Sequence, residues 1–264
     1  MKRVVFSVVL TLLCVVLANA QFKGVRVDRA VNAVAKGVQS FTITDAEIIG
    51  YTNEYMKWMD THNPVCKTND SDAGKKAVAD RLATITSVVP DDLSKSLNLN
   101  ILAYYVIDVN AFACANGDIR VFAALMDLMT DEEILAVIGH EIGHIVNKDS
   151  KDRFVTALRI SALKDAAGAV GGNTTTALTD SQLGDLAEAL GNAQYSQKQE
   201  NDADAYGYEF LKKCGKDPGN MASSLGVLLK LQEEAGSPEN SKYQQLFSSH
   251  PDLKKRIETL NKKK

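Results

Sequence analysis

His140, Glu141 and His144 lie in the run His-Glu-Ile-Gly-His, whose residue types and spacing suit hydrolysis at a metal ion. Side chains four residues apart on a helix share one face, so both imidazoles can point at the same ion. Neutral imidazoles suit zinc, which lowers the pKa of a bound water from about 15.7 towards about 7. Glu141 can take the proton from that water and pass it to the leaving amine. The run therefore predicts two zinc ligands and a general base.

A helix from Asp131 to about Lys148 must position these three residues. Thr130 and Glu133 fit a capping box, in which a hydroxyl caps the helix and a glutamate three residues on reaches back. Apolar residues then recur at helical spacing, at Ile134, Val137, Ile138, Ile142 and Ile145. The alternative interpretation is that His140 and His144 are surface residues of this helix and bind no metal.

A catalytic zinc site needs three protein ligands and one open position, so a third ligand must come from another element. Ser150 stands where the metzincin pattern has its last histidine, which excludes that family. Besides His62 and His250, the candidates are carboxylates on a second predicted helix, where Glu200 and Asp204 are four residues apart. Glu200 would then bind zinc, and Asp204 would accept a hydrogen bond from a ligand histidine and fix its tautomer. On these residues alone, a solvated charged helix face is an equal alternative.

Together these residues resemble the HtpX-like and CAAX-prenyl-protease group of zinc metallopeptidases. The resemblance covers about residues 40 to 260 and rests on His140–His144, on Glu200-x-x-Ala203-Asp204, and on the stretches Asp108–Ala113, Asn116–Asp131 and Ser248–Pro251 with Arg256. It implies that Glu200 is a ligand, that one zinc ion binds per chain, and that the chain is a metalloendopeptidase acting on polypeptides. Similarity to the soluble, exported members implies protein quality control, with misfolded or misassembled envelope proteins as substrates, and allows peripheral association with the outer membrane.

The resemblance implies further roles near the metal. Asn110 and Ala111 would lie on an edge strand that hydrogen-bonds an extended substrate. His250 would lie on a loop near the active site, where it either stabilises the transition state or caps the zinc, unless it only begins a helix. Arg256 would pair with an acidic residue of the site or be exposed. Asp149 stands where many relatives carry a histidine, and we expect it not to be a ligand.

The first residues have the pattern of an export signal. A charged start precedes the apolar residues 4–17, and Ala18-Asn19-Ala20 supplies a small-x-small cleavage site. The apolar stretch is shorter than the roughly 20 residues that span a bilayer. The pattern predicts removal of residues 1–20 and a mature metallopeptidase domain of residues 21–264, located in the periplasm of a Gram-negative-type bacterium. The alternative is an uncleaved membrane anchor.

Composition and cysteines limit the remaining choices. The net charge of −3 and the lack of a basic cluster, apart from the three C-terminal lysines, argue against a nucleic-acid partner, and nothing indicates an oligomeric state. An exported chain can hold disulfides, so we expect Cys66 to pair with Cys114 and Cys214 to be free. Three free thiols are the alternative.

The pattern of elements predicts an α+β, mainly helical, zincin-like single domain with a small β-sheet next to the metal helix. A strand is expected at 101–107, and Asn116-Gly117 signals a hairpin. The other expected helices span 41–60, 73–88, 180–213, 221–235 and 251–260, and residues 166–176 form a loop or a break.

Two other functions use the same residues. One is a zinc-binding, chaperone-like protein that holds clients without proteolytic turnover, against which Glu141 argues because binding alone needs no base. The other is a structural zinc site, which normally has four closed protein ligands.

Overall fold

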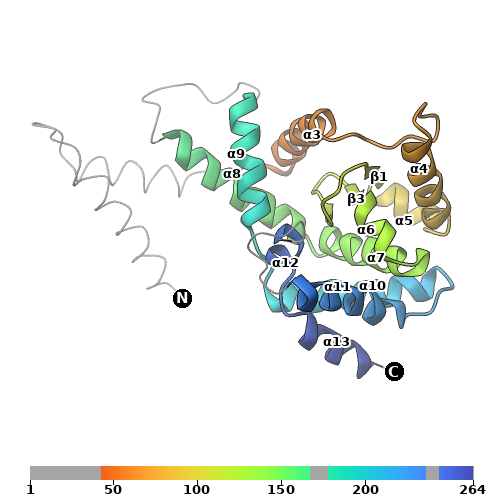
Figure 1. The fold of residues 1–264 in the computed structure, drawn as a ribbon. Helices are drawn as coiled ribbons and strands as arrows, with labels where there is room; N and C mark the ends of the chain where they lie inside the picture. Colours follow the sequence, from red (N-terminus) through yellow and green to blue (C-terminus); the bar gives the residue numbers. More distant parts are fainter. Residues whose placement is uncertain (1–42, 167–177, 236–243, 264) are drawn as a thin grey trace, which may run out of the picture. The chain divides into compact units, whose positions relative to one another are not determined.

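The structure, a computed structural model, describes residues 43–166, 178–235 and 244–263 (Figure 1). They belong to one compact unit, Ile43–Lys264. The predicted signal peptide and, apart from Ala166, the predicted loop at 166–176 lie outside the described residues. Among the described helices, none is long and apolar enough to cross a membrane.

The described residues are mainly helical, as predicted, with a small sheet. The helices are α3 (Asp45–His62), α4 (Ala73–Thr86), α5 (Asp91–Ser96), α6 (Ala123–Leu128), α7 (Asp131–Val146), α8 (Asp149–Ala166), α9 (Asp180–Asn192), α10 (Gln197–Lys213), α11 (Asn220–Ala235), α12 (Gln244–Ser249) and α13 (Leu253–Asn261). The strands are β1 (Asn100–Tyr104), β2 (Ala111–Ala113) and β3 (Asp118–Phe122).

The sheet has the order β1-β3-β2, with β3 parallel to β1 and antiparallel to β2. The predicted Asn116-Gly117 turn joins β2 to β3. Gly117 has a φ of 95°, and a β-carbon there would lie 2.3 Å from the Leu97 carbonyl oxygen, so only glycine fits this turn. The turn leaves β2 at the edge of the sheet, next to α7.

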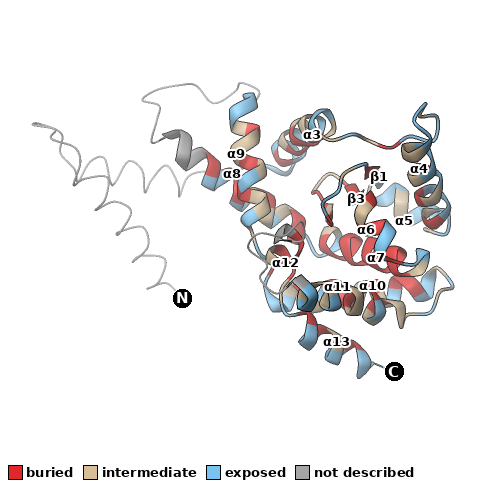
Figure 2. Cartoon of the chain, viewed as in Figure 1, coloured by how far each residue is buried: buried red, intermediate tan, exposed pale blue. Residues whose placement is uncertain are grey.

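Helix α7 is the centre of the fold. Its predicted capping box is present: the Glu133 amide donates to Thr130 Oγ1, and the Thr130 amide donates to Glu133 Oε2. Every residue from Glu133 to His144 is buried, and Figure 2 shows α7 almost wholly in the buried colour. The helix is buried on several sides because β2, α8, α10 and α11 pack around it. The buried polar side chains of α7 are therefore stable only where hydrogen-bond or ion-pair partners contact them.

Helices α7 and α10 approach closely because small residues line their contact (Figure 1). A β-carbon at Gly139 would lie 2.4 Å from the Phe210 ring. One at Gly143 would lie 3.0 Å from the Ala203 backbone, and one at Gly207 would lie 3.1 Å from the His140 amide nitrogen. The glycines thus bring the His140 turn of α7 directly against α10.

The single long helix predicted over residues 180–213 is wrong. Helix α9 ends at Asn192. Helix α10 begins separately at Gln197 because Ser196 caps it, with Gln199 completing a capping box. The short helices α5, α6 and α12, and the long helix α8, were not predicted. The strand predicted to reach residue 107 ends at Tyr104.

The predicted Cys66–Cys114 disulfide is also wrong, since all three described cysteines are free. Cys66 belongs to the core cluster that also contains residues of the sheet and of α7, whereas Cys114 packs with α3 and α8, where its thiol lies 3.4 Å from Met56 Sδ. The two side chains thus belong to separate apolar clusters.

Replacing Gly139 with alanine should push α7 away from α10. We expect Gly139→Ala to lower the free energy of unfolding by about 1–3 kcal/mol, as overpacking does. Gly226→Ala on α11 is the matched control, because no atom lies within 4 Å of its β-carbon position. That variant should be neutral or stabilising by up to about 1 kcal/mol. Urea unfolding checks both, and equal effects would contradict the close approach.

Candidate metal centre

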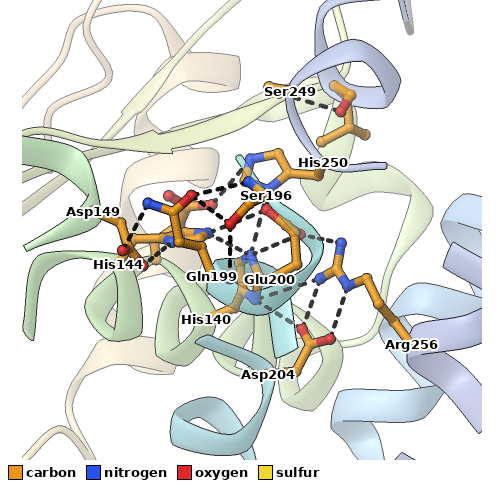
Figure 3. Close-up of polar contacts among 12 residues, drawn as sticks. His140, His144, Asp149, Ser196, Gln199, Glu200, Asp204, Ser249, His250 and Arg256 are labelled. Atoms are coloured by element: carbon orange, nitrogen blue, oxygen red, sulfur yellow. Dashed lines mark hydrogen bonds and ion pairs between the residues drawn. The ribbon is translucent and has the colours of Figure 1, made fainter. Parts of the chain in front are cut away.

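Four buried side chains converge at the contact between α7 and α10 (Figure 3). They are His140 and His144 from α7, Glu200 from α10, and His250 from the turn between α12 and α13, and their ligand atoms all lie within 4.8 Å of one another. The Nε2 atoms of His140 and His144 are 3.1 Å apart. Glu200 Oε1 lies 3.5 Å from His144 Nε2 and 3.0 Å from His250 Nδ1. The sequence named all four residues as candidates.

Each α7 histidine is held at its other ring nitrogen by a carboxylate. His140 Nδ1 lies 2.9 Å from Asp204 Oδ1, the contact expected for Asp204. His144 Nδ1 lies 3.0 Å from Asp149 Oδ2. A carboxylate at Nδ1 fixes the proton there and leaves Nε2 free to accept a metal ion. Both rings are therefore oriented with Nε2 towards the cluster.

Asp149 was not recognised as a partner of His144 from the sequence. No residue type in the sequence signals this contact, because it depends on the backbone at the end of α7: Lys148 has a φ of 64°, and α8 then starts beside His144. Gln199 Nε2 donates to Asp149 Oδ1 at 3.0 Å. The capping box of α10 therefore supports the carboxylate that orients His144 (Figure 3).

Arg256 of α13 is buried and pairs with both carboxylates of α10, so the exposed alternative is excluded. Its Nε and Nη2 donate to the two oxygens of Asp204 at 2.8 and 2.7 Å. Its Nη1 forms an ion pair with Glu200 Oε2, without the geometry of a hydrogen bond. A bidentate guanidinium fixes the plane of a carboxylate, so Arg256 holds Asp204 in position for His140.

The charges of the cluster follow from these contacts. Burial opposes ionisation of Glu200, but His250 and Arg256 outweigh it and hold the pKa of Glu200 well below its usual range. Burial likewise opposes ionisation of Asp204, and the Arg256 charge lowers its pKa below the usual value. For Glu141, burial dominates and raises the pKa. Glu200 and Asp204 are thus held as anions beside a carboxyl that takes up a proton more readily.

The pKa values of the two α7 histidines are shifted in opposite directions. Burial lowers the pKa of His140 despite its bond to Asp204. Burial acts in the same direction on His144, but hydrogen bonds to Asp149 and Glu200 outweigh it and raise the pKa to about 9. His250 has a pKa lowered by burial.

The residues present fit a metal ion. Imidazole nitrogens and a carboxylate oxygen are the ligands that zinc prefers, and a buried carboxylate anion calls for a cation. Glu200 Oε2 is ion-paired with Arg256, whereas Oε1 lies among the imidazole nitrogens of His144 and His250. Glu141 lies beside this donor set, with Oε1 3.8 Å from His250 Nε2, and does not belong to it. The site therefore combines a donor set with a separate buried carboxyl.

Asn110 and Ala111 lie next to the cluster at the start of β2. Ala111 lines a cavity of about 30 Å³ together with His140 and Glu141. The Asn110 carbonyl accepts from the Phe122 amide at 3.0 Å, and its side-chain oxygen accepts from the Ala111 amide at 2.9 Å. The structure thus places the predicted strand beside Glu141. Both oxygens of Asn110 already accept hydrogen bonds from within the chain.

Tyr195 and Arg153 also belong to the surroundings of the cluster, and the sequence did not reveal them. The Tyr195 ring stacks on His144 with centroids 3.8 Å apart and an angle of 11°. The Arg153 guanidinium lies 4.8 Å from the centre of the same ring. Tyr195 occupies the break between α9 and α10, which the predicted continuous helix would not have allowed.

Comparison with known proteins agrees with this site. The sequence profile described as peptidase family M48 matches residues 81–264. The chain therefore belongs to peptidase family M48, and it is a metallopeptidase that acts on polypeptides.

Two relatives come from Escherichia coli (strain K12). Metalloprotease LoiP is 37% identical over 217 residues, covering 82% of this chain and 80% of the relative. Metalloprotease YcaL is 33% identical over 235 residues, covering 89% and 87%. The crystal structure of S. mikatae Ste24p is 22% identical with a TM-score of 0.40, and the match covers 81% of this chain and 55% of that one. The family assignment rests on the sequence matches.

Loss of the Asp149 charge should weaken metal binding. We expect Asp149→Asn to lower the affinity for zinc by about tenfold or more, because second-layer carboxylates orient ligand histidines. Asp152→Asn, an exposed position on the same helix, is the control and should leave the affinity unchanged. Competition with a chromophoric chelator measures both. An Asp149→Asn affinity equal to wild type would show that Asp149 does not orient His144.

Proposed function

We propose that this chain is a zinc-dependent metalloendopeptidase in which His140, His144 and Glu200 bind one zinc ion and Glu141 is the general base. The observation that carries the proposal is the convergence of these ligand atoms within 4.8 Å. Glu141 follows His140 directly on α7, and at 3% exposure it is shielded from bulk solvent. A peptidase mechanism needs both a metal and a base in such a position.

Zinc, when bound, supplies a Lewis acid and lowers the pKa of water at the site. The chain's own residues do the rest. The pKa of Glu141, raised by burial, lies closer to the working pH, so this carboxyl can accept a proton and return it to the leaving amine. Asp204 and Asp149 hold the ligand histidines. His250 lies near both Glu141 and Glu200 and would either stabilise the transition state or cap the metal.

The substrate is proposed to bind in extended form along the start of β2. Support comes from Ala111, which lies at the sheet edge and shares a cavity with Glu141. Backbone pairing with a strand selects for extended segments and not for one sequence. This suits unfolded chains, so we propose misfolded or misassembled envelope proteins as the physiological substrates, in a protein quality control role.

The place of action is proposed from the N-terminal sequence. Residues 1–20 have the charged start, apolar core and small-x-small site of a cleaved signal, leaving residues 21–264 as the mature metallopeptidase domain. The proposed location is the periplasm of a Gram-negative-type bacterium, with peripheral association with the outer membrane.

A second candidate is a zinc-dependent client-binding protein without turnover. His250 favours it, because with His250 the cluster has four converging, buried ligand residues, as a closed structural site does. Glu141 argues against it, because a closed site has no use for a buried carboxyl that is not a ligand. The two candidates differ in whether a bound polypeptide is cut.

Replacing Glu141 with glutamine tests the endopeptidase against the client-binding protein. We expect Glu141→Gln to keep one zinc per chain and to reduce casein cleavage by about 100-fold or more, because the base is lost and the ligands stay. Glu234→Gln, an exposed position on α11, makes the same chemical change away from the site and should cleave as wild type does. If Glu141→Gln cleaves casein as fast as wild type, the assignment of the base is wrong.

Export is tested by the N-terminus of the protein recovered from a cell. We expect the chain in the periplasmic fraction to start at Gln21, because cleavage follows Ala20. Amino-terminal sequencing measures this directly. A chain that keeps residues 1–20 in the membrane fraction would instead indicate an anchor.

A further inference from the structure

A second cavity, of about 50 Å³, lies between the start of β2 and α8. Its lining includes the polar residues Tyr55, Asn110, Ser150, Arg153 and Ser249. We propose that this cavity binds a carboxylate group of the peptide substrate through Arg153. The proposal rests on the proposed endopeptidase function and adds a substrate preference to it.

Arg153 is a half-buried cation that forms no ion pair with a carboxylate among the described residues, although the Glu141 charge acts on it from a greater distance. Its Nη2 donates to the Leu190 carbonyl oxygen at 2.5 Å, and its Nε is buried without a hydrogen-bond partner. The two fully buried arginines are treated differently: Arg120 pairs with Asp60 and Asp118, and Arg256 pairs with Glu200 and Asp204. A desolvated guanidinium without an anion is unfavourable, so Arg153 is suited to receive one from outside the chain.

Two further hydrogen-bond donors stand beside Arg153. The Ser150 and Tyr195 hydroxyl oxygens are buried and make no hydrogen bond. The Tyr195 hydroxyl faces Ser150 and Arg153 without reaching normal hydrogen-bond geometry to either. Within the described residues, Arg153 Nε and the Ser150 and Tyr195 hydroxyls therefore meet at one place without a hydrogen bond of normal geometry.

A carboxylate matches these donors better than a neutral group does. It brings a full negative charge to the guanidinium and offers two oxygens with several lone pairs to the neighbouring hydroxyls. The cavity exceeds the volume that one water molecule needs, so a small group of this kind can enter.

The cavity is placed to read a residue close to the cleaved bond. Ala111 lines both this cavity and the one that contains His140 and Glu141. Ser249, which lines the carboxylate cavity, directly precedes His250 of the metal cluster (Figure 3). A substrate lying along the start of β2 therefore passes both cavities. The carboxylate is either an aspartate or glutamate side chain near that bond or the carboxyl terminus of the substrate.

Paired peptides test the proposal. One series carries Glu or Gln at each of about three positions on either side of the cleaved bond, and a second series ends in a free acid or an amide. We expect wild type to favour the acidic member at one position by about tenfold or more in kcat/KM, as charged hydrogen bonds do. Arg153→Gln should reduce that ratio to about one. Lys230→Gln, which removes an exposed positive charge on α11, should leave the ratio unchanged.

Preference in the first series identifies a side chain, and preference in the second identifies the carboxyl terminus. The proposal is overturned if wild type shows no acidic preference in either series. It is also overturned if Arg153→Gln lowers kcat/KM equally for acidic and neutral peptides, because Arg153 would then only support Tyr195 on His144. If Arg153→Gln does not fold, Arg153→Lys serves instead. It retains the charge and should keep part of the preference.

Binding to the Glu141→Gln protein separates this proposal from the proposed function. If wild type cuts no peptide with zinc bound, the endopeptidase assignment fails. Fluorescence anisotropy with the same peptides still shows whether acidic members bind about tenfold more tightly. Equal binding of acidic and neutral members would overturn the carboxylate site alone.

Discussion

The close contact between α7 and α10 is the constraint on which the site depends. Gly139 and Gly207 occupy positions where a β-carbon would meet the opposite helix at 2.4 Å, from the Phe210 ring, and at 3.1 Å, from the His140 amide nitrogen. With larger side chains the helices would stand further apart, and Glu200 could not come within 3.5 Å of His144 Nε2. The same glycines that weaken a helix intrinsically thus allow the donor set to assemble.

Around this contact, a carboxylate holds each α7 histidine, and a second side chain holds each carboxylate. His140 is held by Asp204, which is held by Arg256, while His144 is held by Asp149, which is held by Gln199 (Figure 3). Asp204 and Gln199 come from α10, Asp149 comes from α8 and Arg256 comes from α13, so the orientation of the two imidazoles depends on the packing of α7, α8, α10 and α13 together. Arg153 departs from this pattern because it forms no ion pair with a carboxylate in the part of the chain that the structure describes, which is the basis for the proposed carboxylate site.

Much of the site could be predicted, because its signals are local. The capping box at Thr130 and the spacing of His140 and His144 depend on a single helix. The spacing of Glu200 and Asp204 depends on another helix, but that spacing fits a solvated charged face equally well, and the family resemblance was needed to predict Glu200 as a ligand. What could not be predicted depends on how separate segments meet. The break before Ser196, which brings Tyr195 onto His144, needs a cap that competes with a continuous helical pattern. The Cys66–Cys114 pair failed because pairing arithmetic contains no distances.

The central claim is that one zinc ion binds between His140, His144 and Glu200. Anomalous diffraction at the zinc edge from crystals of the zinc-loaded protein tests it most directly. The account predicts one peak per chain, about 2.0–2.2 Å from an imidazole nitrogen of each histidine and from a Glu200 oxygen. A peak elsewhere, or one that Glu200 does not contact, would contradict it.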